Sequence, residues 1–191
     1  MKRQRMCGIV SVAAVAGFAL VCLSASAQND ITGKNLSNSD MTFAKKAAQG
    51  GIAEVKLGEI AVKNGASDSV KQFGQKMIDD HSKANDELKQ IASGKGITLP
   101  TDTDAKSKAT MAKLEKLHGA AFDAAYIKDM KTDHQHDIAE FRKEARSGHD
   151  ADIKGFASKV LPVIEGHYKM VSSMGKSGGS MKAHRSPGSK M

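Results

Sequence analysis

Residues 67–94 read SDSVKQFGQKMIDDHSKANDELKQIASG, and this stretch decides the fold class. Side chains that would share one face of an α-helix recur every three or four residues: Val70, Phe73, Met77, His81, Ala84, Leu88 and Ile91. Ser67 or Asp68 is a suitable N-cap, and Gly94 and Gly96 end the pattern. The stretch therefore predicts a long amphipathic helix with one histidine on its apolar face.

Three further stretches show the same spacing. We expect helices from Ser39 or Asp40 to about Asn64, from about residue 119 to about Gly148, and from about Asp150 to 172. Their apolar faces read Phe43, Ala47, Gly50, Glu54, Leu57 and Ala61; Phe122, Tyr126, Met130, His134, Ile138, Phe141 and Ala145; and Ile153, Phe156, Val160, Ile164, His167 and either Met170 or Val171. Pro162 should kink the last helix.

Four long amphipathic helices without strand signals predict an all-α fold, a four-helix bundle in residues 39–172. A shorter helical pattern over residues 106–118 is suited to a crossover helix that returns the chain to the other end of the bundle. The alternative is an extended helical hairpin that dimerises.

The first 27 residues have the pattern of a cleavable signal peptide. A basic start is followed by an apolar stretch and by Ala25-Ser26-Ala27, the small residues that signal peptidase requires. An uncleaved signal anchor is the alternative. Residues 28–38 then form a flexible leader and residues 173–191 a basic, disordered tail. We therefore expect an exported protein, periplasmic or outer-membrane-associated, with no transmembrane segment after cleavage.

Composition excludes several functions. Both cysteines lie in the signal, so the expected mature chain has no disulfide. The net charge of +8 arises largely at the two ends, and there is no Trp, so the folded part does not indicate a nucleic-acid binder. No nucleophile elbow, phosphate-binding loop or dinucleotide fingerprint occurs. The tail could instead contact anionic envelope polymers or bind metal.

The pattern Met-x-x-Asp-His occurs twice, ending at His81 and at His134. Each of the four apolar faces contains one residue that is not hydrophobic: Glu54, His81, His134 and His167. With a helical rise of about 1.5 Å per residue and a crossover, these residues lie roughly 15, 20, 22 and 18 Å below the turn between the first two helices. A plain up-down topology would spread them over roughly 11 Å. The sequence therefore predicts that they converge in one layer of the bundle.

Such a layer has two interpretations. It is a metal site, in which Glu54, His81, His134 and His167 are candidate ligands, together with Met77 and Met130 one turn before two of the histidines. Imidazole suits several transition metals, and thioether selects Cu(I), so copper is favoured. Alternatively, the layer is a hydrogen-bonded polar network that fixes helix register. Asp80 and Asp133 point away around their helices, as surface groups or partners of the ligands.

The chain resembles an exported bacterial family that carries domain of unknown function 4142. The resemblance covers roughly residues 39–172 and lies in Gly50-Gly51-x-x-Glu54-Val55-x-Leu57-Gly58, Phe73-x-x-x-Met77-x-x-Asp80-His81, Leu99-Pro100, Phe122-Asp123-x-x-Tyr126-x-x-x-Met130-x-x-Asp133-His134 and Leu161-Pro162-x-Ile164-x-x-His167. It implies a ferritin-like four-helix fold and an envelope location, but no agreed activity. Di-iron ferritin-like enzymes carry Glu-x-x-His on two helices. Here Ile78, Lys131 and Ile164 stand three residues before the histidines, which argues against a di-iron site.

Three functions remain open from the sequence. The first is a protein that sequesters a metal ion, with copper favoured, or protects against stress. The second is a non-catalytic envelope module whose Glu/His layer is purely structural. The third is an enzyme that uses Glu54 with a histidine as acid and base, which requires an open pocket in the bundle centre. The residues favour a binding or structural protein over an enzyme.

Overall fold

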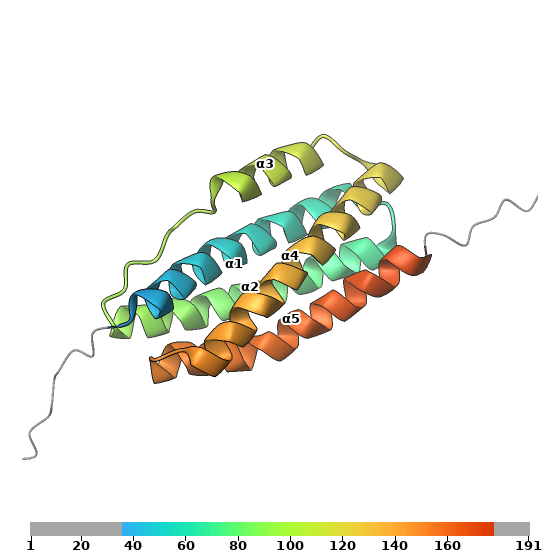
Figure 1. Cartoon of the computed structure of the whole chain (residues 1–191). Helices are drawn as coiled ribbons and strands as arrows, with labels where there is room; N and C mark the ends of the chain where they lie inside the picture. Colours follow the sequence, from blue (N-terminus) through green and yellow to red (C-terminus); the bar gives the residue numbers. More distant parts are fainter. Residues whose placement is uncertain (1–35, 178–191) are drawn as a thin grey trace, which may run out of the picture. The chain divides into compact units, whose positions relative to one another are not determined.

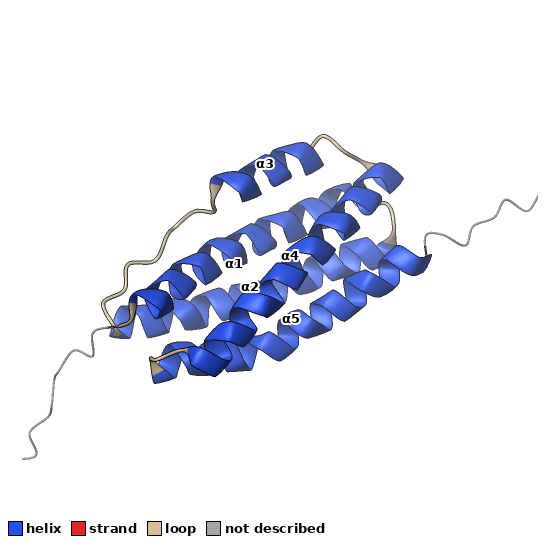
Figure 2. Cartoon of the chain, viewed as in Figure 1, coloured by secondary structure: helices blue, strands red, loops and turns tan. Residues whose placement is uncertain are grey.

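The computed structural model describes residues 36–177, and within this range the secondary structure is helical throughout (Figures 1 and 2). The five helices are α1 (Asn38–Asn64), α2 (Asp68–Gly94), α3 (Ala105–Leu114), α4 (Gly119–Ser147) and α5 (Ala151–Ser177). The expected signal sequence, most of the expected leader and most of the expected tail lie outside the described residues. None of the five helices combines the length and the apolar character that crossing a membrane requires.

The helices form the predicted four-helix bundle with a crossover. α1 packs against α2 and α4 packs against α5, and the two hairpins meet through α2 with α5 and α1 with α4. α1 and α5 run in one direction and α2 and α4 in the other (Figure 1). The chain therefore has to return along the bundle between α2 and α4, and α3 makes this return on the outside of α1. The extended, dimerising hairpin is excluded because both hairpins come from one chain.

A carboxylate from each hairpin holds the turn of the other. Asp123, in the first turns of α4, accepts hydrogen bonds from the backbone N–H groups of Ala66 and Ser67 at 2.9 Å each. Asp40, in the first turn of α1, accepts from the N–H groups of His149 and Asp150 at 3.2 and 2.8 Å. The four bundle helices are thereby fixed at both ends, so side chains at matching heights stay level.

The closest approach of α1 and α2 occurs at a pair of glycines. A Cβ on Gly58 would lie 2.6 Å from the Gly74 carbonyl oxygen, and one on Gly74 would lie 2.8 Å from the Gly58 oxygen. Further along α1, a Cβ on Gly51 would overlap the Asn85 side chain, whereas one on Gly50 would meet nothing within 4 Å.

The bundle interior consists of two apolar clusters with a polar layer between them. One cluster contains Phe73, Met77, Phe122, Tyr126 and Met130 among its members, and the other contains Phe43, Leu88, Phe141, Phe156 and Ile164. Along each bundle helix the change from one cluster to the other falls at the expected polar residue: Glu54, His81, His134 and His167. All four are buried.

The helix ends agree with the sequence within a few residues. Ser37 and Ser67 cap α1 and α2 through their hydroxyls. Gly119, at the start of α4, has a φ of +64° and lets the chain turn out of the crossover. α5 extends to Ser177, whereas we expected the last helix to end at about residue 172. Pro162 lies inside α5, as expected.

Candidate metal centre

Three histidines from three helices meet in the polar layer. His81 comes from α2, His134 from α4 and His167 from α5. One ring nitrogen of each lies within 4.8 Å of those of the other two. The ring centroids are 5.4–6.1 Å apart. His134 and His167 are fully buried and His81 is 7% exposed. The predicted convergence of these three residues is therefore present in the fold.

An aromatic ring forms one wall of the histidine cluster. The Phe73 ring lies two turns before His81 on α2, and its centroid is 6.4 Å from that of His134 and 6.1 Å from that of His167. Phe73 is fully buried and belongs to the apolar cluster on this side of the layer. The ring keeps water from this side of the cluster and limits the rotamers that the two imidazoles can adopt.

Hydrogen bonds fix the tautomers of two imidazoles. The Nδ1–H of His134 donates to the carbonyl oxygen of Met130 at 3.0 Å, and its Nε2 has no partner. The Nε2–H of His167 donates to Asp80 Oδ2 at 2.9 Å, and its Nδ1 has no partner. His81 Nε2 also lacks a partner among the described residues. His134 and His167 thus each offer one buried lone-pair nitrogen, the form in which imidazole binds metal, and His81 offers its buried Nε2 when its proton lies on Nδ1.

Asp80 lies beside the histidine cluster, where α2 of one hairpin packs against α5 of the other. It precedes His81 on α2 but reaches across to His167 on α5, and Lys76 binds the same carboxylate oxygen at 2.9 Å. Burial alone would raise the pKa of Asp80, but the bonds from Lys76 and His167 outweigh burial and lower it. A carboxylate that orients a histidine through its second nitrogen is a common feature of metal sites.

The electrostatics of the cluster keep its imidazoles neutral. Burial, with a smaller contribution from the neighbouring His167, lowers the pKa of His134 to about 4. Burial also holds the pKa of His81 well below its ordinary value. For His167, burial lowers the pKa although Asp80 opposes the shift. Since a metal ligand must be deprotonated, these histidines are ready to bind at neutral pH.

The spacing of the nitrogens suits a metal ion after a small adjustment. Metal–nitrogen bonds of about 2.0–2.1 Å place the ligand nitrogens of a three-histidine site about 3.3–3.6 Å apart. The present nitrogens lie within 4.8 Å of one another. An ion bound by all three nitrogens would therefore require the imidazoles to rotate toward one another. The residues present therefore fit a bound metal ion.

Glu54 occupies the same layer but faces a different group of residues. Its Oε1 lies 3.6 Å from His134 Nδ1, too far for a hydrogen bond. Its carboxylate instead lies with those of Asp133 and Asp137, with one oxygen of each within 4.8 Å of the others. Burial, together with Asp133, raises the pKa of Glu54 well above its ordinary value, and burial raises that of Asp137 to about 7.

The two methionines lie in the apolar cluster next to the histidines. Met77 and Met130 are both buried, one helical turn before His81 and His134. Met130 contributes its backbone carbonyl to His134. Thioether ligation by either residue stays a prediction.

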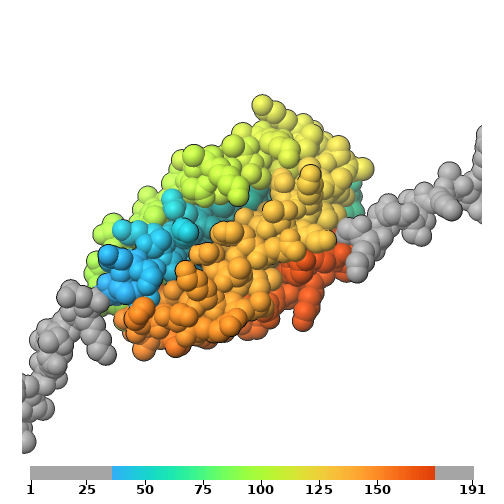
Figure 3. All heavy atoms as spheres, in the orientation of Figure 1, coloured from blue at the N-terminus to red at the C-terminus, as the bar shows by residue number. Residues whose placement is uncertain are grey.

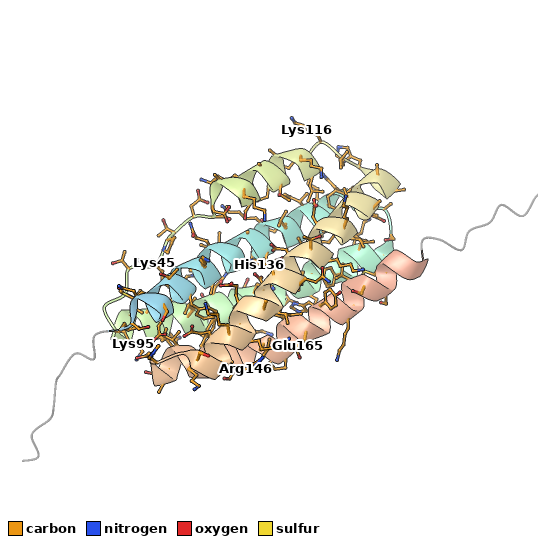
Figure 4. The ribbon with its side chains drawn as sticks, viewed as in Figure 1. Lys45, Lys95, Lys116, His136, Arg146 and Glu165 are labelled. Carbon is orange, nitrogen blue, oxygen red and sulfur yellow. The ribbon has the colours of Figure 1, made fainter. Side chains whose placement is uncertain are left out.

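A groove connects the histidine cluster with the surface. It has a volume of about 230 Å³, lies between α2 and α5, and is lined by Asp80, His81, Val163 and His167 among others. Val163, at its rim, is 40% exposed. His136 on α4 does not belong to the histidine cluster, because its side chain is 68% exposed (Figure 4). The groove gives a metal ion a short route to the buried nitrogens.

Sequence reasoning missed two features of this region. Asp137 was not recognised, although Asp133 and Asp137 stand four apart and so share a face of α4. The anchoring roles of Asp40 and Asp123 were also missed, because they depend on contacts between chain segments far apart in sequence. Asp80 was expected as a surface group or a partner of the ligands, and it contacts His167.

Comparison with known proteins gives a family and a related fold. The family model described as Domain of unknown function (DUF4142) matches residues 25–174. Among solved structures, a DUF305 fragment from Deinococcus radiodurans is similar at a TM-score of 0.67 and 11% identity, covering 74% of this chain and 98% of that fragment. At this identity the likeness shows the fold alone. No curated protein matches the sequence. The chain belongs to the DUF4142 family.

Proposed function

We propose that this protein is exported and binds a metal ion, with copper favoured, through His81, His134 and His167, and that it sequesters the ion without turning over a substrate. The observation that carries the proposal is the presence of three buried imidazole nitrogens without partners, one on each histidine. Buried polar atoms normally have hydrogen-bond partners. Three such atoms, on histidines whose rings meet in one layer of the bundle, are best explained by a shared ligand.

Charge supports Cu(I) over divalent ions. The three imidazoles are neutral, and the carboxylate of Asp80 next to His167 is already paired with Lys76, so little negative charge is left to compensate a bound ion. Burying an ion is costly unless its charge is compensated, so a monovalent cation matches this site better than a divalent one. Imidazole is a suitable copper ligand, and Met77 and Met130 place soft sulfur one turn away, should a fourth ligand be needed.

A direct binding titration tests the proposal. The purified protein is titrated anaerobically with Cu(I) against a chromophoric competitor, and the stoichiometry and affinity are compared with those of a triple His→Ala variant at positions 81, 134 and 167. The matched control replaces two exposed histidines, His136 and His149, by alanine. We expect one bound ion per chain in the wild type and in the control, and loss of that ion in the triple variant. If a folded triple variant bound Cu(I) as tightly as the wild type, these three histidines would not form the site.

One observation favours a second candidate function, a purely structural layer in an envelope module. The bond from His167 to Asp80 ties α5 to α2, and such a bond stabilises a bundle without any ligand. Under this alternative, His167→Ala lowers the stability of the protein by about 1–3 kcal/mol because Asp80 loses a partner. No metal would then raise the melting temperature of the wild type.

A further inference from the structure

A second group of potential ligands lies beside the histidines, and it consists of oxygen donors only. Glu54 projects from α1, and Asp133 and Asp137 project from α4 toward it. One carboxylate oxygen of each lies within 4.8 Å of the other two. Asp133 and Asp137 share a face of α4 because they are four residues apart. Three carboxylates are thus held together by the packing of two helices.

The protein itself leaves this group unsatisfied. Glu54 is fully buried, and neither of its carboxylate oxygens has a hydrogen-bond partner among the described residues. The buried hydroxyl of Tyr126 also lacks a partner among the described residues. One carboxylate cannot satisfy another unless a proton or a cation lies between their oxygens. The group therefore has room for a cation in place of a shared proton.

Two of the three carboxylates, those of Asp133 and Asp137, line a cavity that opens to the outside of the bundle, whereas Glu54 lies behind them, fully buried. A cavity of about 590 Å³ between α1, α3 and α4 is lined by Asp133, Asp137 and Asp129 on α4. Figure 3 shows the crossover lying against α1, and the start of α3 contributes Asp104, Lys106 and Ser107 to the lining of this cavity. Lysines line the same cavity. The charge of Lys106 lowers the pKa of Asp137, although burial and neighbouring carboxylates outweigh this effect. The cavity has room for the waters that a hydrated cation keeps.

We infer that Glu54, Asp133 and Asp137 form a second cation site, which binds a hard divalent cation and is separate from the histidine cluster. Carboxylate oxygens and water are the ligands that Mg²⁺, Ca²⁺ and Mn²⁺ prefer, whereas the neighbouring imidazoles suit softer ions. The two sites adjoin where Glu54 Oε1 lies 3.6 Å from His134 Nδ1. The bundle centre thus offers a nitrogen site and an oxygen site for different classes of metal.

Mn²⁺ is the probe for this site, because the signal of the free hydrated ion in electron paramagnetic resonance falls when the ion binds. The purified protein, cleared of metal, is titrated with Mn²⁺, and the titration is repeated with Asp133→Asn/Asp137→Asn. The matched control is Asp79→Asn/Asp86→Asn, two acids on the exposed face of α2. We expect one Mn²⁺ per chain in the wild type and the control, with the dissociation constant raised at least about tenfold in the first variant.

A second variant separates the two sites. The triple His→Ala variant at positions 81, 134 and 167 should keep its Mn²⁺ affinity, because the carboxylates alone hold the ion. Thermal unfolding of each variant verifies the fold. Because Asp133 and Asp137 are only partly buried, their replacement should not unfold the bundle. The inference is overturned if the wild type binds no Mn²⁺, in which case protons alone satisfy the carboxylates. It is also overturned if the folded Asp→Asn variant binds Mn²⁺ as well as the wild type.

Discussion

The buried, neutral state of His134 makes the metal-free protein sensitive to acid. Burial lowers the pKa of His134 in the folded protein to about 4, from an ordinary value of 6.5. As the pH falls below 6.5, the unfolded chain binds a proton at this position, whereas the folded chain does not bind it until the pH approaches 4. The stabilisation that the folded protein gains from keeping His134 neutral is therefore fully present above pH 6.5 and is lost as the pH falls toward 4.

The size of this loss follows from the shift. Each pKa unit corresponds to about 1.4 kcal/mol, so His134 should lower the free energy of unfolding by about 3 kcal/mol between pH 7 and pH 4. His134→Gln cannot take up the proton. The stability difference between wild type and variant should accordingly shrink by about 3 kcal/mol over this range, whatever its value at pH 7.

Urea unfolding in the presence of a chelator, followed by circular dichroism at several pH values, measures this difference. His136→Gln is the matched control, because it removes an exposed imidazole two residues further along α4. It should leave the pH dependence of stability unchanged. A wild-type–His134→Gln difference that stays constant from pH 7 to pH 4 would refute the reasoning, since His134 would then titrate alike in the folded and unfolded chains.

Three further predictions concern the scaffold. Burial, with Asp40 nearby, raises the pKa of Glu144 to about 7, so the folded protein holds this proton more tightly and loses stability as the pH rises from about 4.5 to 7; in urea titrations Glu144→Gln should gain stability relative to wild type on going from pH 5 to pH 8. Asp123→Ala removes the acceptor of two backbone N–H groups in the α1–α2 turn and should cost roughly 1–3 kcal/mol in chemical denaturation, whereas the exposed Asp86→Ala should cost little. Gly58→Ala places a methyl group 2.6 Å from the Gly74 oxygen and should destabilise by roughly 1–3 kcal/mol, while Gly50→Ala, which meets nothing, should stabilise α1 by up to about 1 kcal/mol; equal effects of the two on the melting temperature would contradict the close helix contact.

Sequence periodicity was sufficient to predict the bundle and the meeting of its histidines. A stripe of apolar side chains marks the inward face of each helix, and the rise per residue gives the height of any residue once the turns are located. His81, His134 and His167 could therefore be placed in one layer. The crossover over α3 made the heights agree, since it sets α4 running in the same direction as α2.

The partners of each polar group could not be predicted in the same way, because they depend on how far each helix is rotated about its axis. Glu54 lies at the height of the histidines but faces Asp133 and Asp137. Asp80 follows the same rule: it crosses to His167 because α2 packs beside α5. A rotation of a few tens of degrees would change either contact while leaving the apolar stripes in place.

The most direct test of the central claim, that His81, His134 and His167 bind a metal ion in the folded protein, is thermal unfolding with and without added metal. Cu(I), Cu(II), Zn(II), Ni(II) and Fe(II) are compared, each with a chelator control. A ligand at a hundredfold excess over its dissociation constant stabilises the folded state by about 2.7 kcal/mol. For a chain of this size the melting temperature should rise by roughly 5–10 °C. We predict this rise with copper in the wild type and its absence in the triple His→Ala variant. No rise with any metal, or the same rise in the variant, would contradict the account.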